Sequence, residues 1–272
     1  MRSQFTEQDT EAFYDAEDEL YRSFWDQEGS LHWGLFDQNT GEDFLEACVN
    51  LNRVMAQKAG IGSSARVLDL GCGNGNTATW LCKSIGCQIS GIDLSGVRIS
   101  NALAAVQALP QEFRTLLSFQ KVSATDLPFD DECFTHAWSQ ATIYHVHEKK
   151  QALKQVYRTL EPNGIFIFDD LIKPKQDISQ AAQQYVYERL LFDTPFSFST
   201  YQDALEDVGF KVLEAQDLSE HLKRSYRCLS QMALNRSEGY DDKFRQLSFA
   251  YQQMVQAIEN QDLGWAMYLC QK

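Results

Sequence analysis

The sequence predicts an α/β protein with a doubly wound, mainly parallel sheet. Short apolar runs alternate with helical periodicity from residue 66 to residue 170. A glycine-rich turn follows the first of these runs, and two runs end in an acid. With 272 residues, of which 44% are apolar, the chain can bury one large core. Strands that alternate with helices are joined by right-handed crossovers, so their carboxyl ends share one edge of the sheet.

An amphipathic helix is expected near the N-terminus. Residues 1–30 carry nine acids and two bases, and their apolar residues recur at steps of three and four. We expect the acidic side of this helix, over residues 7–28, to face solvent. A second helix is predicted at residues 41–58, just before a glycine that would end it.

The remaining elements alternate along the chain. Strands are predicted at residues 66–70, 87–93, 116–122, 134–140, 164–170, 210–218 and 263–270. Helices are predicted from the glycine-rich turn to residue 85, at 96–108, 148–160, 177–192 and 200–208, and around 244–258. The cluster Glu161–Gly164 is expected to separate a helix from the fifth strand. The result is a seven-stranded, Rossmann-like sheet with helical lid segments at the N-terminus and after the fifth strand.

The charge balance excludes some classes of partner. The chain has 24 Lys and Arg against 38 Asp and Glu, a net charge of −14. Binding to nucleic acid or to an anionic membrane relies on clustered positive charge, so we expect neither. A small neutral or cationic molecule is the partner that fits best.

The cysteines and the N-terminus indicate a cytoplasmic protein. The seven cysteines are odd in number and form no CxxC, which is typical of reduced thiols. The acidic start resembles neither a signal peptide nor a transit peptide, and no apolar run is long enough to span a membrane. We expect a monomer or a homodimer.

The sharpest motif is the turn Asp69–Gly75, which reads DLGCGNG between a strand and a helix. Glycines allow a tight turn and leave no Cβ between the backbone and a ligand. The spacing is G-x-G-x-G, whereas a pyrophosphate-binding turn reads G-x-G-x-x-G. An acid directly before the turn suits an ammonium and repels a phosphate. Asp93 ends the next strand, where a carboxylate can bind ribose hydroxyls. An adenosyl ligand without phosphates, S-adenosylmethionine, satisfies all these conditions. The alternative, a tight turn with no ligand, does not account for the two acids.

The ordered motifs VLDLGCGNGN, GIDLS, SATDLPF, AWSQ and LEPNGIFIFDD resemble those of the class I S-adenosylmethionine-dependent methyltransferases. The stretches FYDAEDELYRSFW, LHWGLF and WSQATIYH are most similar to the sarcosine/dimethylglycine N-methyltransferases. More loosely, they resemble tocopherol, phosphoethanolamine and cyclopropane-type methyltransferases. The resemblance implies one domain in three parts: an N-terminal helical lid (1–60), a cofactor-binding core (61–171), and lid helices with the last two strands (172–272).

The resemblance also implies which residues hold S-adenosylmethionine. The expected cofactor-binding residues are Trp33, Asp69, Gly71, Gly73, Asp93, Leu94, Ser123, Ala124 and Gln140. Among them, the acid and glycines of the turn would hold the methionine end, with Trp33 beside it. Asp93 would bind the ribose, and Leu94, Ser123 and Ala124 would meet the adenine.

Two catalytic residues are expected, His145 and Tyr14. His145 would be a general base or an orienting group, because histidine titrates near neutral pH, and a packing role is the alternative. Tyr14 would contact the substrate or the sulfonium, or simply pack. A metal pair of His145 and His147 is disfavoured, since no other ligand is near in sequence, and no metal is expected.

Other residues are expected around the substrate. The aromatic series Phe192, Phe196, Phe198 and Tyr201 would form the wall of a partly apolar pocket. One of Asp169 and Asp170 would contact substrate, or both would cap a loop. In the dimethylglycine-type pattern an Asp precedes the histidine, where this chain has Ala141, and this weakens the case for a cationic amino acid.

The predicted activity is methyl transfer from S-adenosylmethionine to a small molecule. N-methylation of a small amine is the leading hypothesis, and C- or O-methylation of an aromatic, prenyl or polyketide-like metabolite is the alternative. A nicotinamide- or flavin-linked oxidoreductase is disfavoured by the glycine spacing, and a non-catalytic binding module by the intact turn.

Overall fold

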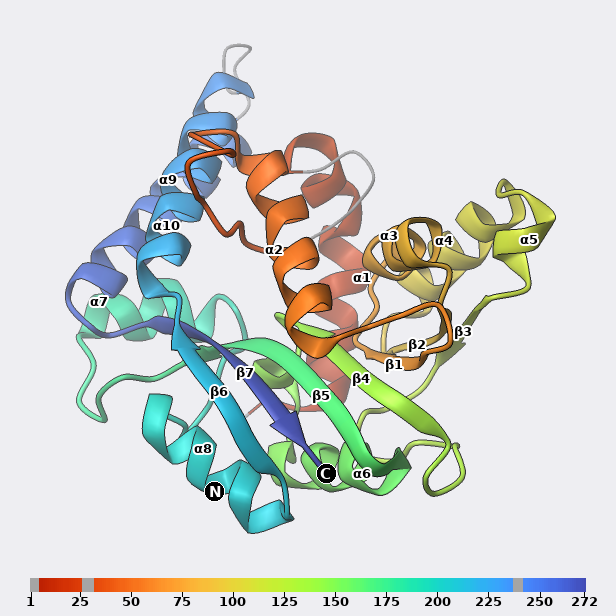
Figure 1. Cartoon of the computed structure of the whole chain (residues 1–272). Helices are drawn as coiled ribbons and strands as arrows, with labels where there is room; N and C mark the ends of the chain where they lie inside the picture. The colour runs from red at the N-terminus through yellow and green to blue at the C-terminus, as the bar shows by residue number, and fades with distance from the viewer. Residues whose placement is uncertain (1–4, 26–31, 237–241) are drawn as a thin grey trace.

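A seven-stranded sheet forms the centre of the computed structural model, which describes residues 5–25, 32–236 and 242–272 (Figure 1). The strands are β1 Arg66–Leu70, β2 Gln88–Asp93, β3 Leu117–Lys121, β4 Phe134–Gln140, β5 Leu160–Ile172, β6 Lys211–Asp217 and β7 Gly264–Gln271. Their order is β3-β2-β1-β4-β5-β7-β6. All neighbours pair in parallel except β7, which is antiparallel to β5 and β6. The predicted fold class is confirmed.

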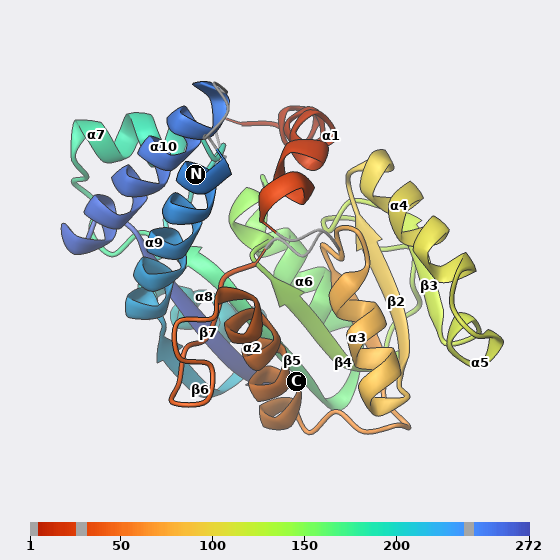
Figure 2. The ribbon, with the colours of Figure 1, turned by 90° about the horizontal axis from the view of Figure 1, so that it is seen from above.

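Helices cover both faces of this sheet (Figures 1 and 2). They are α1 Glu7–Phe24, α2 Phe44–Ala59, α3 Asn76–Ile85, α4 Gly96–Gln107, α5 Gln111–Arg114, α6 Lys149–Thr159, α7 Gln180–Ala182, α8 Phe198–Val208, α9 Ser219–Arg236 and α10 Asp242–Glu259. Short 3₁₀ and π segments occupy Ile143–His145 and Gln183–Glu188. Helices α2, α3, α4 and α9 lie on one face, and α6 and α8 on the other. Helix α1 lies between α4 and α9 (Figure 2).

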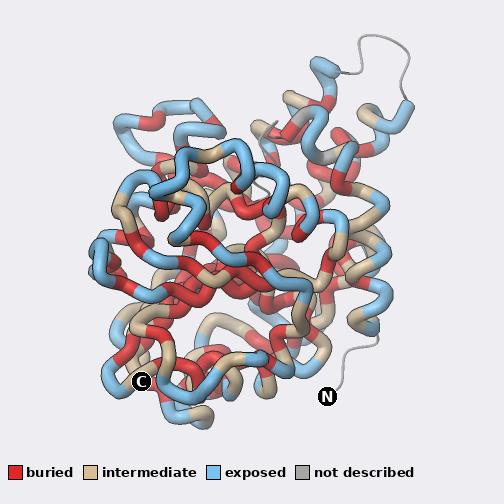
Figure 3. Tube along the Cα trace, turned by 90° about the vertical axis from the view of Figure 1, so that its right-hand side faces the viewer, coloured by how far each residue is buried: buried red, intermediate tan, exposed pale blue. Residues whose placement is uncertain are grey.

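The sheet is the most deeply buried layer of the protein (Figure 3). Val67, Leu68 and Leu70 of β1 are fully buried, because helices remove both sides of a parallel sheet from water. The continuous apolar run in the sequence reflects this two-sided burial. In such sheets, ligands bind at the carboxyl edge of the strands, beyond the ends of β1 and its neighbours.

Side-chain caps fix where the helices near that edge begin. The Asp43 side chain accepts a hydrogen bond from the Glu46 amide and starts α2, three residues later than predicted. Ser95 caps α4 in the same way through the Arg98 amide. Each such cap contributes about 1 kcal/mol to helix stability. The cap at Ser95 therefore fixes the backbone directly after Asp93.

The structure corrects three details of the predicted elements. The cluster Glu161–Gly164 belongs to β5, as a bulge between the pairs Phe134 with Leu160 and His136 with Ile165. The helix predicted at residues 177–192 is confined to 180–188. Helix α9 was not predicted, although its buried residues Leu222, Tyr226, Leu229 and Ala233 recur at steps of three and four. Among the described residues, no helix is both long and apolar enough to cross a membrane.

Candidate active site

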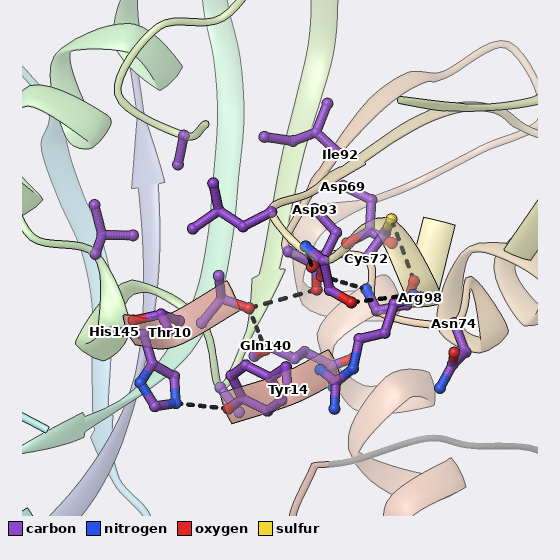
Figure 4. Close-up of a pocket in the computed structure, with 18 of the residues that line it drawn as sticks. Thr10, Tyr14, Asp69, Cys72, Asn74, Ile92, Asp93, Arg98, Gln140 and His145 are labelled. Carbon is purple, nitrogen blue, oxygen red and sulfur yellow. Dashed lines mark hydrogen bonds between the residues drawn. The ribbon is translucent and has the colours of Figure 1, made fainter. Parts of the chain in front are cut away.

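A cavity lies at the carboxyl edge of β1, β2 and β4, under helix α1 (Figure 4). All the predicted site residues line it except Trp33 and Ser123. The glycine turn forms its floor. The amides of Gly71 and Cys72 donate to the Ile92 carbonyl at 2.8 and 2.9 Å, which ties the turn to β2.

Gly71 and Gly73 cannot be replaced by larger residues without strain. Both have positive φ, +78° and +54°, which side-chain-bearing residues rarely adopt. A Cβ on Gly71 would lie 2.2 Å from the Thr142 side chain. The glycine therefore allows the chain after β4 to pack directly against the turn. A Cβ on Gly73 would meet no heavy atom closer than 4.0 Å, so the backbone of the turn stays open toward the cavity.

Asp93 is held in a fixed orientation at the end of β2. Its Oδ2 accepts a hydrogen bond from the Gly73 amide at 2.9 Å, and its Oδ1 accepts from the Ser95 amide at 2.8 Å. Each carboxylate oxygen retains acceptor capacity beyond these bonds. The side chain can therefore bind two neighbouring hydroxyls without reorganising.

Asp69 is a buried carboxyl group behind the turn. It is 3% exposed, and its Oδ2 has no hydrogen-bond partner among the described residues. Burial, followed by the negative charge of Asp93, raises the pKa of Asp69 to about 7. A cationic group placed beside Asp69 would stabilise its ionised form and satisfy the orphaned oxygen.

The adenine side of the predicted cofactor site is only partly as expected. Leu94 and Ala124 line the cavity, whereas Ser123 does not. The Ser123 hydroxyl donates to Oε1 of Glu7 at 2.5 Å and shares a bond with Thr125 at 2.7 Å. Ser123 therefore contacts helix α1 rather than the cavity.

Gln140, at the end of β4, is fixed by two side chains on the opposite wall. Its Oε1 accepts from the Thr77 hydroxyl at 3.1 Å, and its Nε2 donates to Oδ1 of Asn52 at 2.9 Å. The next residues turn over the glycine loop, where the Thr142 hydroxyl donates to the Gln140 carbonyl at 2.8 Å. This turn ends at His145.

The structure brings the two predicted catalytic residues together. The Tyr14 hydroxyl lies 2.6 Å from Nε2 of His145, although 131 positions separate them in the sequence (Figure 4). The rings meet edge to face at 5.1 Å. Tyr144 completes the group, with its hydroxyl 3.4 Å from that of Tyr14.

His145 does not titrate near neutral pH, contrary to the expectation from sequence. Burial, and then the positive charges of Lys149 and Arg98, lower the pKa of His145 to about 3. The Leu191 backbone acts weakly in the opposite direction. The imidazole is therefore neutral, with Nε2 free to accept the hydroxyl proton of Tyr14.

The expectation that the acidic side of α1 faces solvent is wrong for four of its residues. Glu7, Glu11, Asp15 and Asp18 point at the rim of the cavity and bind, in that order, Ser123, Lys121, Ser95 and Arg98. Asp18 is also the acceptor for the amides of Asn74 at 2.9 Å and Asn101 at 3.1 Å. These acids are one helical turn apart, so a single face of α1 carries them all.

Trp33 is not at the cavity. It is 3% exposed and packs among Tyr144, Tyr226 and Trp265, with ring centroids 5.6 to 6.4 Å away. His32, the preceding residue, lines the cavity instead. These two neighbours therefore differ: His32 lies at the cavity, and the indole of Trp33 completes the aromatic core.

Asp169 and Asp170 are both fully buried and do not line the cavity. Asp169 Oδ1 accepts from the indole nitrogen of Trp265 at 2.8 Å, and burial raises the pKa of Asp169 to about 8. Asp170 accepts from the Tyr144 amide at 2.9 Å and from the Tyr201 hydroxyl at 2.8 Å. Of the two alternatives, capping the loop is the one that the structure supports for Asp170.

The aromatic wall expected from Phe192, Phe196, Phe198 and Tyr201 is likewise interior packing. Phe192 contacts Tyr144, and Phe196 and Tyr201 pack together on the opposite face of the sheet. None of the four lines the cavity.

Sequence reasoning missed Arg98 and Asn74. Arg98 lies in the first turn of α4, lines the cavity and places its guanidinium 3.9 Å from the ring centre of Tyr14. An arginine three residues after a candidate helix-capping serine, Ser95, was the available signal. Asn74, within the glycine turn, was noted only as a spacer.

Comparison with known proteins agrees with this geometry. Residues 68–168 match the family described as "Methyltransferase domain". The chain is 28% identical to (+)-O-methylkolavelool synthase of Herpetosiphon aurantiacus, over 80% of this chain and 75% of that protein. It is 30% identical to the glycine/sarcosine/dimethylglycine N-methyltransferase of Actinopolyspora halophila, over 79% of this chain and 37% of that longer protein.

Among solved structures, the cyclopropane synthase MmaA2 of Mycobacterium tuberculosis shares the fold, with a TM-score of 0.87. The alignment covers 98% of this chain and 99% of that one, at 13% identity. Other relatives are named as O- and C-methyltransferases. Fold, motifs and relatives together define a methyltransferase. The protein is an enzyme of the class I S-adenosylmethionine-dependent methyltransferases.

The cavity residues fit S-adenosylmethionine. The orphaned Asp69 oxygen suits an ammonium, the fixed Asp93 carboxylate suits a pair of ribose hydroxyls, and the open backbone at Gly73 leaves room for the chain between them. Among the described residues that line the cavity, Arg98 is the single Lys or Arg, so they include no cluster of cations that would bind a phosphate.

Proposed function

We propose that the protein methylates the nitrogen of a small amine. The observation that supports this choice is the charge of the cavity: Glu7, Glu11, Asp69 and Asp93 line it, against one arginine, Arg98. Such a lining attracts a cationic amine from solution and favours a sulfonium over an anion. The acceptor class is thereby narrowed to neutral or cationic small molecules.

The cofactor would be held by the residues that the sequence singled out and the cavity contains. We assign the methionine end to Asp69, Gly71 and Gly73, with Gln140 beside it. Asp93 takes the ribose, and Leu94 and Ala124 take the adenine. When bound, S-adenosylmethionine supplies a methyl group on a sulfonium, which is a good leaving group.

The pair Tyr14 and His145 orients the acceptor in this proposal. Because His145 is neutral, its Nε2 accepts a hydrogen bond from the Tyr14 hydroxyl. The Tyr14 oxygen keeps its lone pairs and can accept a hydrogen bond from an N–H of the amine. Its low pKa makes His145 an orienting group rather than a base that ionises near neutral pH. The amine loses its proton to water before it reacts.

Closure by α1 supplies the rest of the catalysis. Alignment of a nucleophile with a methyl group is worth several kcal/mol when the two are held in line without water between them. The bonds from α1 to both walls of the cavity keep that helix in place. The division into a lid (1–60), a core (61–171) and a C-terminal part (172–272) stays a prediction of this mechanism.

A second candidate is O- or C-methylation. It is favoured by Ala141, which lines the cavity next to the catalytic turn and provides no carboxylate for an ammonium. Relatives with each of these activities match the chain.

The test is incubation with methyl-labelled S-adenosylmethionine and a matched acceptor panel. Small primary and secondary amines are compared with phenols and prenyl compounds of similar size, and products are identified by mass spectrometry. Label in amines at rates above those for the other classes supports the proposal. Label confined to oxygen or carbon products refutes N-methylation and leaves the methyltransferase class intact.

A further inference from the structure

Arg98 lines the cavity, and one nitrogen of its buried guanidinium has no hydrogen-bond partner among the described residues. Arg98 is 7% exposed, and its Nη2 is buried and makes no hydrogen bond within residues 5–25, 32–236 and 242–272. Its Nε lies 3.4 Å from Oδ1 of Asp18. Figure 4 shows the side chain reaching from the rim of the cavity to the ring of Tyr14.

Asp18 does not satisfy this guanidinium fully. Its two oxygens are shared with the side-chain amides of Asn74 and Asn101, at 2.9 and 3.1 Å. The ion pair with Arg98 is longer than a good charge-assisted hydrogen bond, which measures about 2.7–2.9 Å. Asp18 therefore anchors the arginine and leaves Nη2 for another acceptor.

An unpaired buried donor on a charged group is costly, and native proteins pair almost all such atoms with protein, water or ligand. Arg98 is also the one cationic Lys or Arg side chain among the described residues that line the cavity. Guanidinium groups match carboxylates through parallel N–H donors, better than they match single hydroxyls.

Arg98 lies near the end of the cofactor site that we assigned to the methionine part of the cofactor. Its Nη1 lies 4.0 Å from the place where a Cβ on Gly73 would be. Gly73 belongs to the turn to which we assigned the methionine end. Of the groups on S-adenosylmethionine, the methionine carboxylate is the one that carries negative charge.

We propose that Arg98 binds the carboxylate of a ligand in this cavity. The methionine end of the cofactor is the favoured source, and a carboxylate on the acceptor is the other. The proposal rests on the proposed function only in taking this cavity as the reaction site. It does not depend on which atom is methylated.

The first experiment compares two ligands that differ in one carboxylate. Binding of S-adenosylmethionine and of decarboxylated S-adenosylmethionine is measured by calorimetry for the wild type and Arg98→Met. If Arg98 binds the cofactor carboxylate, the variant loses about tenfold or more in affinity for S-adenosylmethionine and little for the decarboxylated ligand. A general loss of structure would weaken both ligands equally, so the ratio of the two dissociation constants isolates the contact.

Two further variants separate this contact from the anchoring of the lid. Asp18→Asn disturbs the partner of Arg98 and keeps the guanidinium, so the ratio should stay that of the wild type. The double variant Asp18→Asn, Arg98→Met also removes the buried Asp18 carboxylate, which Arg98→Met alone leaves without its arginine. Its ratio of the two dissociation constants should match that of Arg98→Met and differ from that of the wild type.

The second experiment tests the acceptor as the source. Sarcosine and dimethylamine, which differ in a carboxylate, are titrated into protein saturated with S-adenosylhomocysteine. One outcome is that Arg98→Met weakens the binding of sarcosine but not of dimethylamine, and leaves the ratio of the two cofactor dissociation constants unchanged. That outcome assigns the bound carboxylate to the acceptor. If neither pair of ligands discriminates wild type from variant, the proposal is overturned. These are binding measurements, so failure to find an amine product would leave them unaffected.

Discussion

The floor and the cover of the cavity are built differently. The floor is held through backbone amides: those of Gly71 and Cys72 donate to the Ile92 carbonyl, and those of Gly73 and Ser95 donate to the Asp93 side chain. The cover is a helix held by side chains, with Glu7, Glu11, Asp15 and Asp18 each bound to a different partner on the rim. Backbone bonds within a sheet edge form with the fold, whereas side-chain bonds across a cavity can open without unfolding it.

This difference suggests a division of labour. We propose that the floor determines whether a nucleoside binds and that the cover determines how well the bound molecules are aligned. Substitutions in the floor should change affinity, and substitutions in the cover should change turnover.

The largest effect is expected for Gly71→Val. Its β-branched side chain would occupy the space of the Thr142 side chain, 2.2 Å from a Cβ, at a φ of +78°. We expect loss of measurable S-adenosylhomocysteine binding by calorimetry. Gly62→Ala is the control, because a Cβ there has no neighbour within 4 Å and should leave binding unchanged. Normal binding by Gly71→Val would show that the turn is not the floor of the cofactor site.

Asp93→Ala should weaken S-adenosylhomocysteine binding by about 1–3 kcal/mol, through lost charge-assisted hydrogen bonds. The variant also loses the acceptor of the Gly73 and Ser95 amides. Asp93→Asn, which keeps one acceptor oxygen, should have an intermediate dissociation constant. Equal affinity in all three proteins would remove Asp93 from the ribose site.

Tyr14→Phe tests the cover. It removes the hydroxyl 2.6 Å from His145 Nε2 and keeps the ring under Arg98. We expect kcat to fall about tenfold, while the dissociation constant of S-adenosylhomocysteine stays within twofold. His145→Gln should behave similarly, since no ionisation of His145 is needed. A large loss of cofactor affinity with an unchanged kcat would contradict the proposal that the cover acts on turnover and the floor on affinity.

The smallest effect is a pH dependence in the floor. Burial holds the pKa of Asp69 at about 7, so this group is largely protonated at pH 6 and largely ionised at pH 8. An ammonium binds the ionised form, so S-adenosylmethionine affinity should rise with pH and level off above about 7. For the ligand-free protein the sign is opposite: a raised carboxyl pKa stabilises the fold at low pH and this contribution is lost as pH rises through about 7. Asp69→Asn should flatten the binding curve between pH 6 and 8.

The floor could be predicted from sequence because it is local. A strand, a turn with three glycines and a helix follow one another within 20 residues, and the parallel fold brings Asp93 to the same edge. The cover could not be predicted in the same way. The four acids of α1 have the period of any amphipathic helix, and an acid bound to Arg98 has the same sequence pattern as an acid in water.

The aromatic residues show the same limit. Trp33 and Phe192 were expected at the cavity, and both lie in the core beside Tyr144. Hydrophobicity places such side chains inside the protein, but it does not say whether they face a ligand or each other.

By itself, the sequence determined the sheet, the glycine turn, the two strand-end acids and the class of enzyme. The sheet and the turn follow from backbone conformation and apolar periodicity, which short segments encode, and the class of enzyme follows from the resemblance of the motifs to a known family. Only the tertiary structure decided that Tyr14 meets His145, that His145 stays neutral, and that Arg98 lies buried at the cavity with a donor left over. The physical reason is that desolvation and charge pairing depend on which distant side chains surround a group, and the fold sets that environment.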